Sequence, residues 1–270
     1  MGDLARRNAE LAQVDFGDHT GAGMENVGTN DTLIPFLGII QALSPQVEKG
    51  HAKLIEGAEV GDLYNTVTNE LIGDGKLVHF VACCKQTKFV EWIKRDNGGG
   101  LVGFHEVDSE FVKACKAATK DQFKLTTDED HDLVETHYVY GMLIDGAEGK
   151  TIVHPIVISF SSSKIKVYKG QLMTRIRTIK GDPPMYGFRF AVTVVADKNK
   201  KGQPYKNFKI DPACTDMLGS ANLPGTEYEG LLKEGKALVE AVHGGSAKAD
   251  HTGSTNEAGG GASGDEEEHF

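Results

Sequence analysis

Alternating apolar and polar residues along the chain predict two β-hairpins. In the first, residues 133–144 and 151–160 are rich in Val, Ile, Leu and Tyr, and Asp145–Gly149 supplies the turn between them. In the second, residues 186–197 alternate apolar with polar side chains, and residues 203–210 return after a short turn that contains Lys and Gly. Strands joined by short turns pair antiparallel.

Apolar runs nearer the start of the chain predict further strands. Residues 76–84 are dense in Val, Phe and Leu and predict a buried strand, and residues 88–95 predict a second one. Residues 34–43 form another apolar segment, and residues 52–72 alternate short apolar runs with glycines, as strands and turns do. Glycines recur over residues 98–103 without the pattern of a phosphate-binding loop, so we expect a flexible linker there.

Helical spacing occurs in three segments. Residues 109–120 predict a short helix, and residues 218–242 predict a longer one near the C-terminus. Between the two hairpins, large apolar residues recur as one helical stripe after three serines suited to capping. The members of this stripe are Ile165, Tyr168, Leu172 and Ile176. Gly170 lies inside the predicted helix and costs about 1 kcal/mol relative to Ala.

This order of elements predicts a fold that is mainly β (α+β). Short antiparallel strands with one helix inserted among them are typical of a Greek-key β-barrel like the oligonucleotide-binding (OB) fold. A parallel α/β sheet is excluded, because the strand pairs are joined by turns rather than helices. We therefore expect a flexible arm at residues 1–30, an OB-fold-like domain with a C-terminal helix at 31–243, and a disordered acidic tail at 244–270.

Charge is strongly segregated along the chain. The whole chain carries a net charge of −10. Residues 164–209 nevertheless contain twelve Lys or Arg against Asp182 and Asp197, a local net charge of +10. Residues 244–270 contain six acids against Lys248, a net charge of −5. Segregated charge of this kind steers charged ligands, and a basic segment in an acidic chain indicates a polyanionic partner.

Basic and aromatic residues are interleaved in two segments, a pattern suited to single-stranded DNA. The phosphates of a single strand need Lys or Arg, and its exposed bases need flat rings on which to stack. Tyr186 and Tyr205 share strand faces with polar residues and are better stacking candidates than Phe188 or Phe208, which we expect in the core. The candidate nucleic-acid-binding residues are Lys85, Lys88, Trp92, Lys94, Arg95, Lys169, Arg175, Arg177, Tyr186, Arg189, Tyr205, Lys206 and Lys209.

The last six residues combine acids with an aromatic carboxyl terminus. A terminal aromatic on a disordered segment suits insertion into a partner's pocket, where neighbouring carboxylates meet basic groups. The alternative is that the acids only aid solubility. The same segment can also compete with DNA for the basic residues. The candidate partner-binding residues are Asp265, Glu266, Glu267, Glu268 and Phe270.

Catalytic and metal-binding patterns are almost absent. The segment Asp128–Asp132 contains four carboxylates and His131. We expect an acidic loop before a strand; the alternative is the metal site of a nuclease. No motif of a hydrolase or zinc protease is present, so we expect neither an enzyme nor a cofactor. The four cysteines show no CxxC spacing, so we expect no zinc site. The simplest reading is a protein of a reducing cytoplasm. No apolar run approaches the ~18 residues of a membrane span.

Several segments resemble one known family. Asp265–Phe270 resembles the acidic tail ending in Phe of the single-stranded DNA-binding proteins of tailed bacteriophages, although His269 stands where the bacterial relatives have Pro. Asn26–Leu37, Gly61–Asn65 and Glu91–Arg95 are also similar to phage proteins of this length. The resemblance implies an OB-fold core, sequence-independent binding of single-stranded DNA without a cofactor, and contact of the tail with the replicative polymerase, helicase or primase.

The sequence therefore predicts a single-stranded DNA-binding protein of phage DNA replication, recombination and repair. It would act in the cytoplasm of the infected bacterial host, without a membrane, and self-association is compatible with this reading. The alternative is a structural or assembly protein of the phage particle, which would explain the Gly-rich ends but not the gathered basic charge.

Overall fold

The computed structural model describes most of the chain between the predicted arm and the predicted tail. The described residues are 33–72, 75–119, 125–145, 152–179, 181–199, 202–217 and 226–251. The predicted flexible arm at 1–30 and the partner-binding residues Asp265–Phe270 lie outside them.

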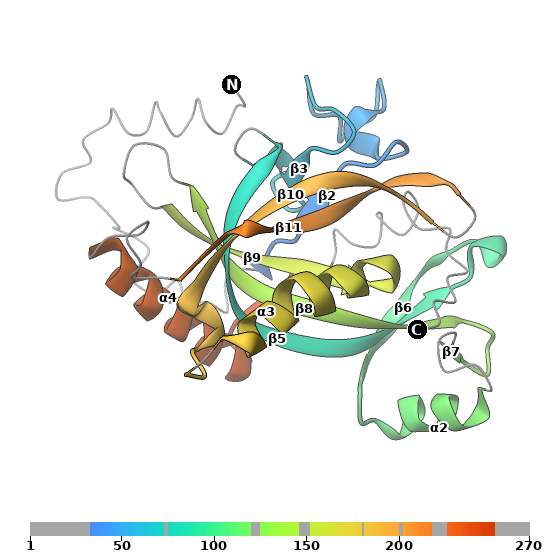
Figure 1. The fold of residues 1–270 in the computed structure, drawn as a ribbon. Coiled ribbons are helices and arrows are strands. Elements are labelled where there is room, and N and C mark those ends of the chain that lie inside the picture. The colour runs from blue at the N-terminus through green and yellow to red at the C-terminus, as the bar shows by residue number, and fades with distance from the viewer. Residues whose placement is uncertain are drawn as a thin grey trace, which may run out of the picture.

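A seven-stranded antiparallel sheet forms the centre of the molecule (Figure 1). Its spine is the long pairing of β5 (Leu77–Ile93) with β8 (Asp132–Asp145). The first half of β5 also pairs with β10 (Phe188–Lys198), which pairs with β11 (Pro204–Met217). On the other side, β8 pairs with β9 (Ile152–Ser161). Both predicted hairpins, β8–β9 and β10–β11, are confirmed.

The second half of β5 has different neighbours. It pairs with β6 (Gly100–Glu106), and the start of β8 pairs with β7 (Leu125–Thr126). The prediction of a flexible linker at residues 98–103 was therefore wrong. Gly98, Gly99 and Gly100 all have positive φ angles, so they form the reversal that returns the chain onto β5 as a strand.

One strand replaces the two predicted at 76–84 and 88–95. The polar residues between them, Lys85 to Thr87, continue β5 and pair with β8. A register shift between Ala82 and Cys84 marks a bulge, where the strand bends without ending.

Three helical segments join end to end on one face of the sheet. They are η4 (Ser162–Lys164), the π-helical η5 (Val167–Met173) and α3 (Thr174–Thr178). Tyr168, Leu172 and Ile176 are buried, as the predicted stripe requires, whereas Ile165 is only half-buried. We call this side of the sheet the helix face.

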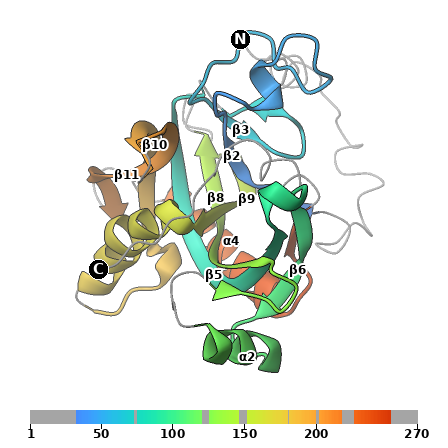
Figure 2. The same cartoon turned by 90° about the vertical axis from the view of Figure 1, so that its right-hand side faces the viewer.

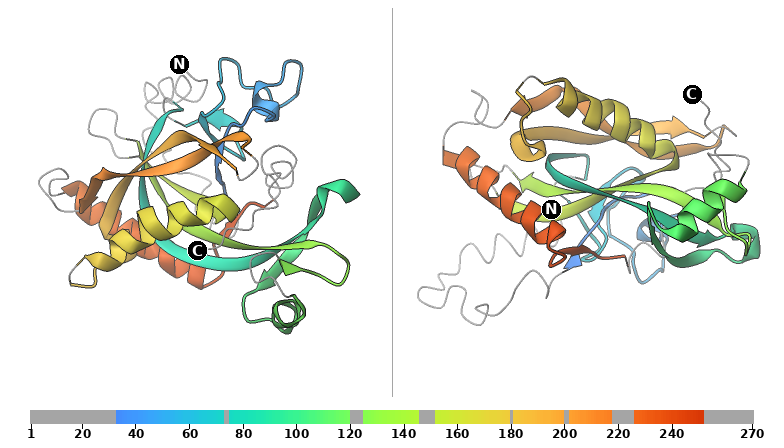
Figure 3. Two further views of the ribbon diagram at one scale, coloured as in Figure 1. Left: turned by 45° about the vertical axis from the view of Figure 1, so that its right-hand side comes forward. Right: turned by 90° about the horizontal axis from the view of Figure 1, so that it is seen from below.

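The opposite side, the α4 face, is covered by α4 (Thr226–His243), and Figure 3 shows the two helices on either side of the sheet. The part of the predicted C-terminal helix at 218–225 lies outside the described residues. The predicted short helix is α2 (Glu110–Ala118), which is capped by Ser109. It packs over the second half of β5 and the start of β8 (Figure 2).

Alternate residues of β5 and β8 contribute to separate cores on the two faces. Phe80, Val139 and Leu143 join the core of the helix face, with Phe188, Phe190 and Phe208, as predicted for these three rings. Cys84, Tyr138 and Tyr140 join the core of the α4 face. The sheet is therefore buried on both sides along its spine.

Smaller elements complete the described part of the chain. β2 (Leu37–Ile39), β3 (Leu63–Asn65) and β4 (Glu70–Leu71) form a three-stranded sheet. Short 3₁₀ turns occur at η2 (Pro45–Val47), η3 (Arg95–Asn97) and η6 (Met185–Gly187).

A two-stranded parallel pair joins the two ends of the described chain. β1 (Leu33–Ile34) pairs with β12 (Lys248–Ala249). Part of the predicted tail, from Gly244 to His251, is thus packed on the body of the protein.

A mainly β fold is confirmed, but the described strands do not close into a barrel. β9 and β11 are not paired with each other. At the edge of β11, Gln41 donates to the carbonyl oxygen of Lys206 at 2.9 Å and accepts from its N–H at 2.8 Å. Farther along, Gln171 of η5 accepts from the N–H of Ile210 at 2.8 Å. Side-chain amides occupy positions that a neighbouring strand would otherwise take.

Candidate nucleic-acid interface

Lys85 and Lys169, one from each predicted segment, both act electrostatically on His137 of the helix face. Both are exposed, and both lie near His137, whose ring stacks on Tyr168 with centroids 4.3 Å apart. Burial lowers the pKa of His137, and the charges of the two lysines lower it further against the opposing effect of Glu135. The imidazole is therefore held neutral between β8 and η5, and the two lysines supply the local positive charge.

The β10–β11 hairpin holds its own polar cluster. The hydroxyl of Tyr205 donates to Asp197 at 2.8 Å, and the Asn207 amide donates to the same carboxylate at 3.1 Å. Burial raises the pKa of Asp197, but these hydrogen bonds and the charge of Lys166 outweigh it, so the net pKa is lowered. Tyr205 is thus fixed and half-buried.

Other predicted residues lie on the α4 face. Arg189 and Lys209 alternate with Phe residues of the helix-face core, so their side chains point to the opposite side. Tyr186 is a packing residue, because it meets α4 so closely that a methyl group on Gly235 would lie 2.8 Å from its Cβ. Trp92 packs against the core that contains Val90.

The remaining candidates are placed as follows. Lys88 and Lys94 form ion pairs with Glu106 and Asp130. The aliphatic stem of Lys206 runs past Gly61. Arg175 and Arg177 lie on α3. The side chain of Arg95 lies outside the described part. The predicted residues are thus spread over both faces and do not form one surface.

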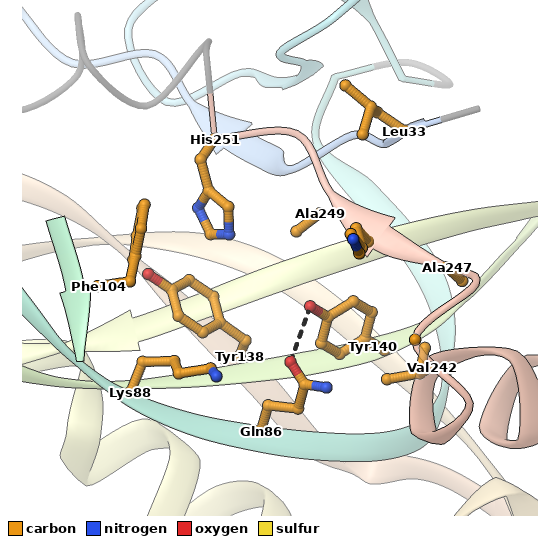
Figure 4. Close-up of a pocket in the computed structure, with 12 residues that line it drawn as sticks. Leu33, Gln86, Lys88, Phe104, Tyr138, Tyr140, Val242, Ala247, Ala249 and His251 are labelled. Carbon is orange, nitrogen blue, oxygen red and sulfur yellow. Dashed lines mark hydrogen bonds between the residues drawn. The ribbon is translucent and has the colours of Figure 1, made fainter. Parts of the chain in front are cut away.

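The α4 face carries an aromatic site that the sequence did not predict (Figure 4). The ring of His251 lies 4.2 Å from Phe104 of β6, 5.2 Å from Tyr138 of β8 and 5.3 Å from Phe36. We call the space between these three rings the aromatic slot. It opens into a cavity of about 370 Å³ that is also lined by Lys88 and Lys248.

The rings of the aromatic slot are neutral. Burial raises the pKa of the Tyr138 hydroxyl, and it raises that of neighbouring Tyr140 to about 12. Tyr140 also donates a hydrogen bond to Gln86 at 3.2 Å. Burial lowers the pKa of His251, and the charge of Lys88 lowers it further against the effect of Asp250. The aromatic rings therefore remain uncharged near pH 7.

Sequence reasoning missed the aromatic slot because its parts are far apart in the chain. Phe104 follows the segment interpreted as a linker, and His251 was assigned to the tail. One available signal was the pair Tyr138 and Tyr140, which share a strand face by their spacing. The neighbours that surround that face become known only from the tertiary structure.

The acidic loop at Asp128–Asp132 contributes to a buried hydrogen-bonded cluster. Glu91 of β5 accepts from His131 Nδ1 and from His105 Nε2, each at 2.8 Å, one imidazole on each carboxylate oxygen. The cluster joins β5 to β6 and to the loop before β8. Across the described ranges, no group of three or more His, Cys, Asp or Glu has an arrangement that could hold a metal ion.

Comparison with known proteins identifies the family. Residues 5–248 match the family described as Pam3 phage gp34-like protein, and because the match covers most of the chain, the chain belongs to this family. This agrees with the phage origin predicted from the sequence. No curated protein and no solved structure matches the chain. Among the described residues, no helix combines the length and apolar character needed to span a membrane.

Proposed function

We propose that this member of the Pam3 phage gp34-like family binds single-stranded DNA without sequence preference. The observation that carries the proposal is the strand order of the sheet. Along the half that contains the hairpins, the order is β9-β8-β5-β10-β11, with a helix between β9 and β10 in the chain. This order and the inserted helix support an OB-like arrangement, and the OB fold is a partly open barrel that commonly binds oligonucleotides.

Charge and rings at two places support the proposal. Lys85 and Lys169 offer exposed ammonium groups to phosphates on the helix face. The aromatic slot is formed partly by Tyr138 of β8, the second strand of the OB-like order along the chain, and by Phe104 of β6, which follows the first strand, β5. OB folds bind their ligands on the corresponding part of the barrel. Phosphate neutralisation and base stacking both tolerate any sequence, because every nucleotide has a phosphate and a flat face.

The proposal assigns the protein to phage replication and recombination in the cytoplasm of the infected host. The bound protein would cover exposed single strands and remove hairpins from them. The acidic tail, with Phe270 as its anchor, would recruit a polymerase, helicase or primase.

The test is a titration of the full chain against a fluorescent oligo-dT 30-mer and a duplex of the same length. We expect the single strand to bind more tightly than the duplex. The logarithm of its binding constant should fall linearly with the logarithm of the salt concentration. No binding of the 30-mer at low salt would refute the proposal. Co-purification with phage particles together with indifference to DNA would favour a structural role instead.

A further inference from the structure

We propose that the aromatic slot is a nucleobase-binding site, which the chain's own His251 fills until single-stranded DNA displaces residues 246–251. This inference rests on the proposed function and deepens it, because it names the place where a base stacks and the segment that must leave. We call residues 246–251 the strap.

The contacts of His251 are those that an unpaired base makes. Its flat heteroaromatic ring is enclosed by Phe36, Phe104 and Tyr138, at centroid distances between 4.2 and 5.3 Å. Proteins bind unstacked bases by placing them against aromatic side chains in this way. Phe104 is 38% exposed, so one wall of the aromatic slot is open to an incoming base.

Room and charge for the rest of a nucleotide lie beside the ring. The adjoining cavity of about 370 Å³ is within the size range of small-ligand pockets. Lys88 and Lys248 both line it, from β5 and from the strap. Lys248 leaves with the strap, and Lys88 is paired with Glu106 in the free protein, so Lys88 meets the phosphate of a stacked nucleotide by exchanging that carboxylate for it.

The strap is held by backbone hydrogen bonds at both ends and by the ring of His251. The N–H groups of Ser246 and Ala247 donate to the carbonyl oxygen of Ala241 at 2.9 and 3.1 Å. β12 pairs with β1 over two residues, and the N–H of Asp250 donates to Ile34 at 2.9 Å. The apolar residues that it buries are Ala247 and Ala249, which bury much less area than a Leu or Phe. Detachment of the strap therefore breaks these hydrogen bonds and removes His251 from the aromatic slot, but it leaves the β5–β8 spine paired.

Displacement would also change where the tail begins. The chain continues from His251 directly into residues 252–270, which contain Glu257 and the four acids at 265–268. Displacement of the strap therefore frees the segment that joins these acids to the body of the protein.

The experiment compares full-length variants by fluorescence anisotropy with oligo-dT. Phe104→Ala removes one wall and should weaken binding by about 5- to 150-fold, the range for loss of one stacked base. His251→Ala removes the competitor and should tighten binding by roughly three- to tenfold. The matched control is Phe111→Ala, a ring of similar exposure (40%) on α2, which should bind like the wild type.

Hydrogen exchange gives a second readout that does not depend on whether Phe104→Ala folds. Amides of the strap should exchange faster in the wild-type complex with oligo-dT than in the free protein, whereas those of β5 should not. If the wild type binds oligo-dT but His251→Ala does not tighten binding and the strap stays protected, the inference is overturned and the proposed function stands. If the wild type does not bind oligo-dT, the proposed function itself fails.

Discussion

Gly141 is a position where one added methyl group has a large expected effect. It lies on β8 opposite the bulge of β5, and a Cβ there would lie 2.3 Å from the Val81 carbonyl oxygen and 2.4 Å from the Phe80 ring. Neither neighbour can move, because both are in the middle of the sheet. Gly141→Ala should therefore lower the free energy of unfolding by about 1–3 kcal/mol or more, as measured by urea denaturation.

Gly170 provides the matched control for that substitution. A methyl group there meets no atom within 4 Å. Gly170→Ala should leave stability unchanged or raise it by up to about 1 kcal/mol, the helix preference of Ala over Gly. Equal effects of the two substitutions would contradict the packing seen around Gly141.

The lowered pKa of the Glu91 carboxyl group leads us to expect that stability depends on pH. Burial raises its pKa, but the hydrogen bonds from His131 and His105 outweigh burial, so the net pKa is below the ordinary value of 4.5. A carboxylate with a lowered folded-state pKa stabilises the fold above its unfolded pKa and loses that contribution as pH falls through the folded value. As pH falls from about 5 through the lowered pKa of Glu91, Glu91→Gln should lose less stability than the wild type.

Urea denaturation at several pH values measures this difference. Glu110→Gln is the control, because the Glu110 side chain is exposed and forms a surface ion pair with Lys113. Its stability should follow the wild-type pH profile. An identical profile for Glu91→Gln would show that the cluster does not contribute to acid sensitivity.

Among the elements, β11 has an edge that side-chain amides protect. Gln41 and Gln171 pair with the backbone of Lys206 and Ile210, so they cover part of an edge that could otherwise bind another strand. Gln41→Ala with Gln171→Ala should speed amide exchange at residues 206 and 210 and lower stability by about 1–3 kcal/mol. Light scattering should show more self-association.

Gln203→Ala, in the exposed turn between β10 and β11, serves as the control for the edge. Its side chain contacts Asn199 of the same turn. This variant should keep the exchange rates of the two β11 amides. Unchanged exchange in the double variant would mean that other groups protect the edge.

For the molecule as a whole, the prediction concerns charge at the helix face. Lys85→Glu with Lys169→Glu should weaken binding of oligo-dT and reduce the slope of log affinity against log salt by about 0.7 for each lost phosphate contact. Lys236→Glu is the control, since this exposed lysine lies on α4 next to Glu240. The double variant changes twice as much charge as the control, so if the control loses half as much binding free energy as the double variant, only net charge matters and the helix face has no special role.

Prediction from sequence succeeded where short-range pattern decides structure. The two hairpins, the short helix after Ser109, and the buried face of Tyr168, Leu172 and Ile176 follow from spacing. Prediction failed at β6, because the turn formed by Gly98–Gly100 looks like a linker until a strand is available for the chain to pair with. It missed the aromatic slot because no local pattern relates Phe104 to His251.

The amino-acid sequence alone determined that the protein is mainly β, where its hairpins lie, and that its charge is segregated, since these depend on neighbouring residues and on composition. The tertiary structure decided which lysines act on His137, that β9 and β11 are not paired, and that His251 lies among three rings. Those outcomes depend on the relative placement of strands distant in the chain, which is set by packing of the two cores rather than by any local preference.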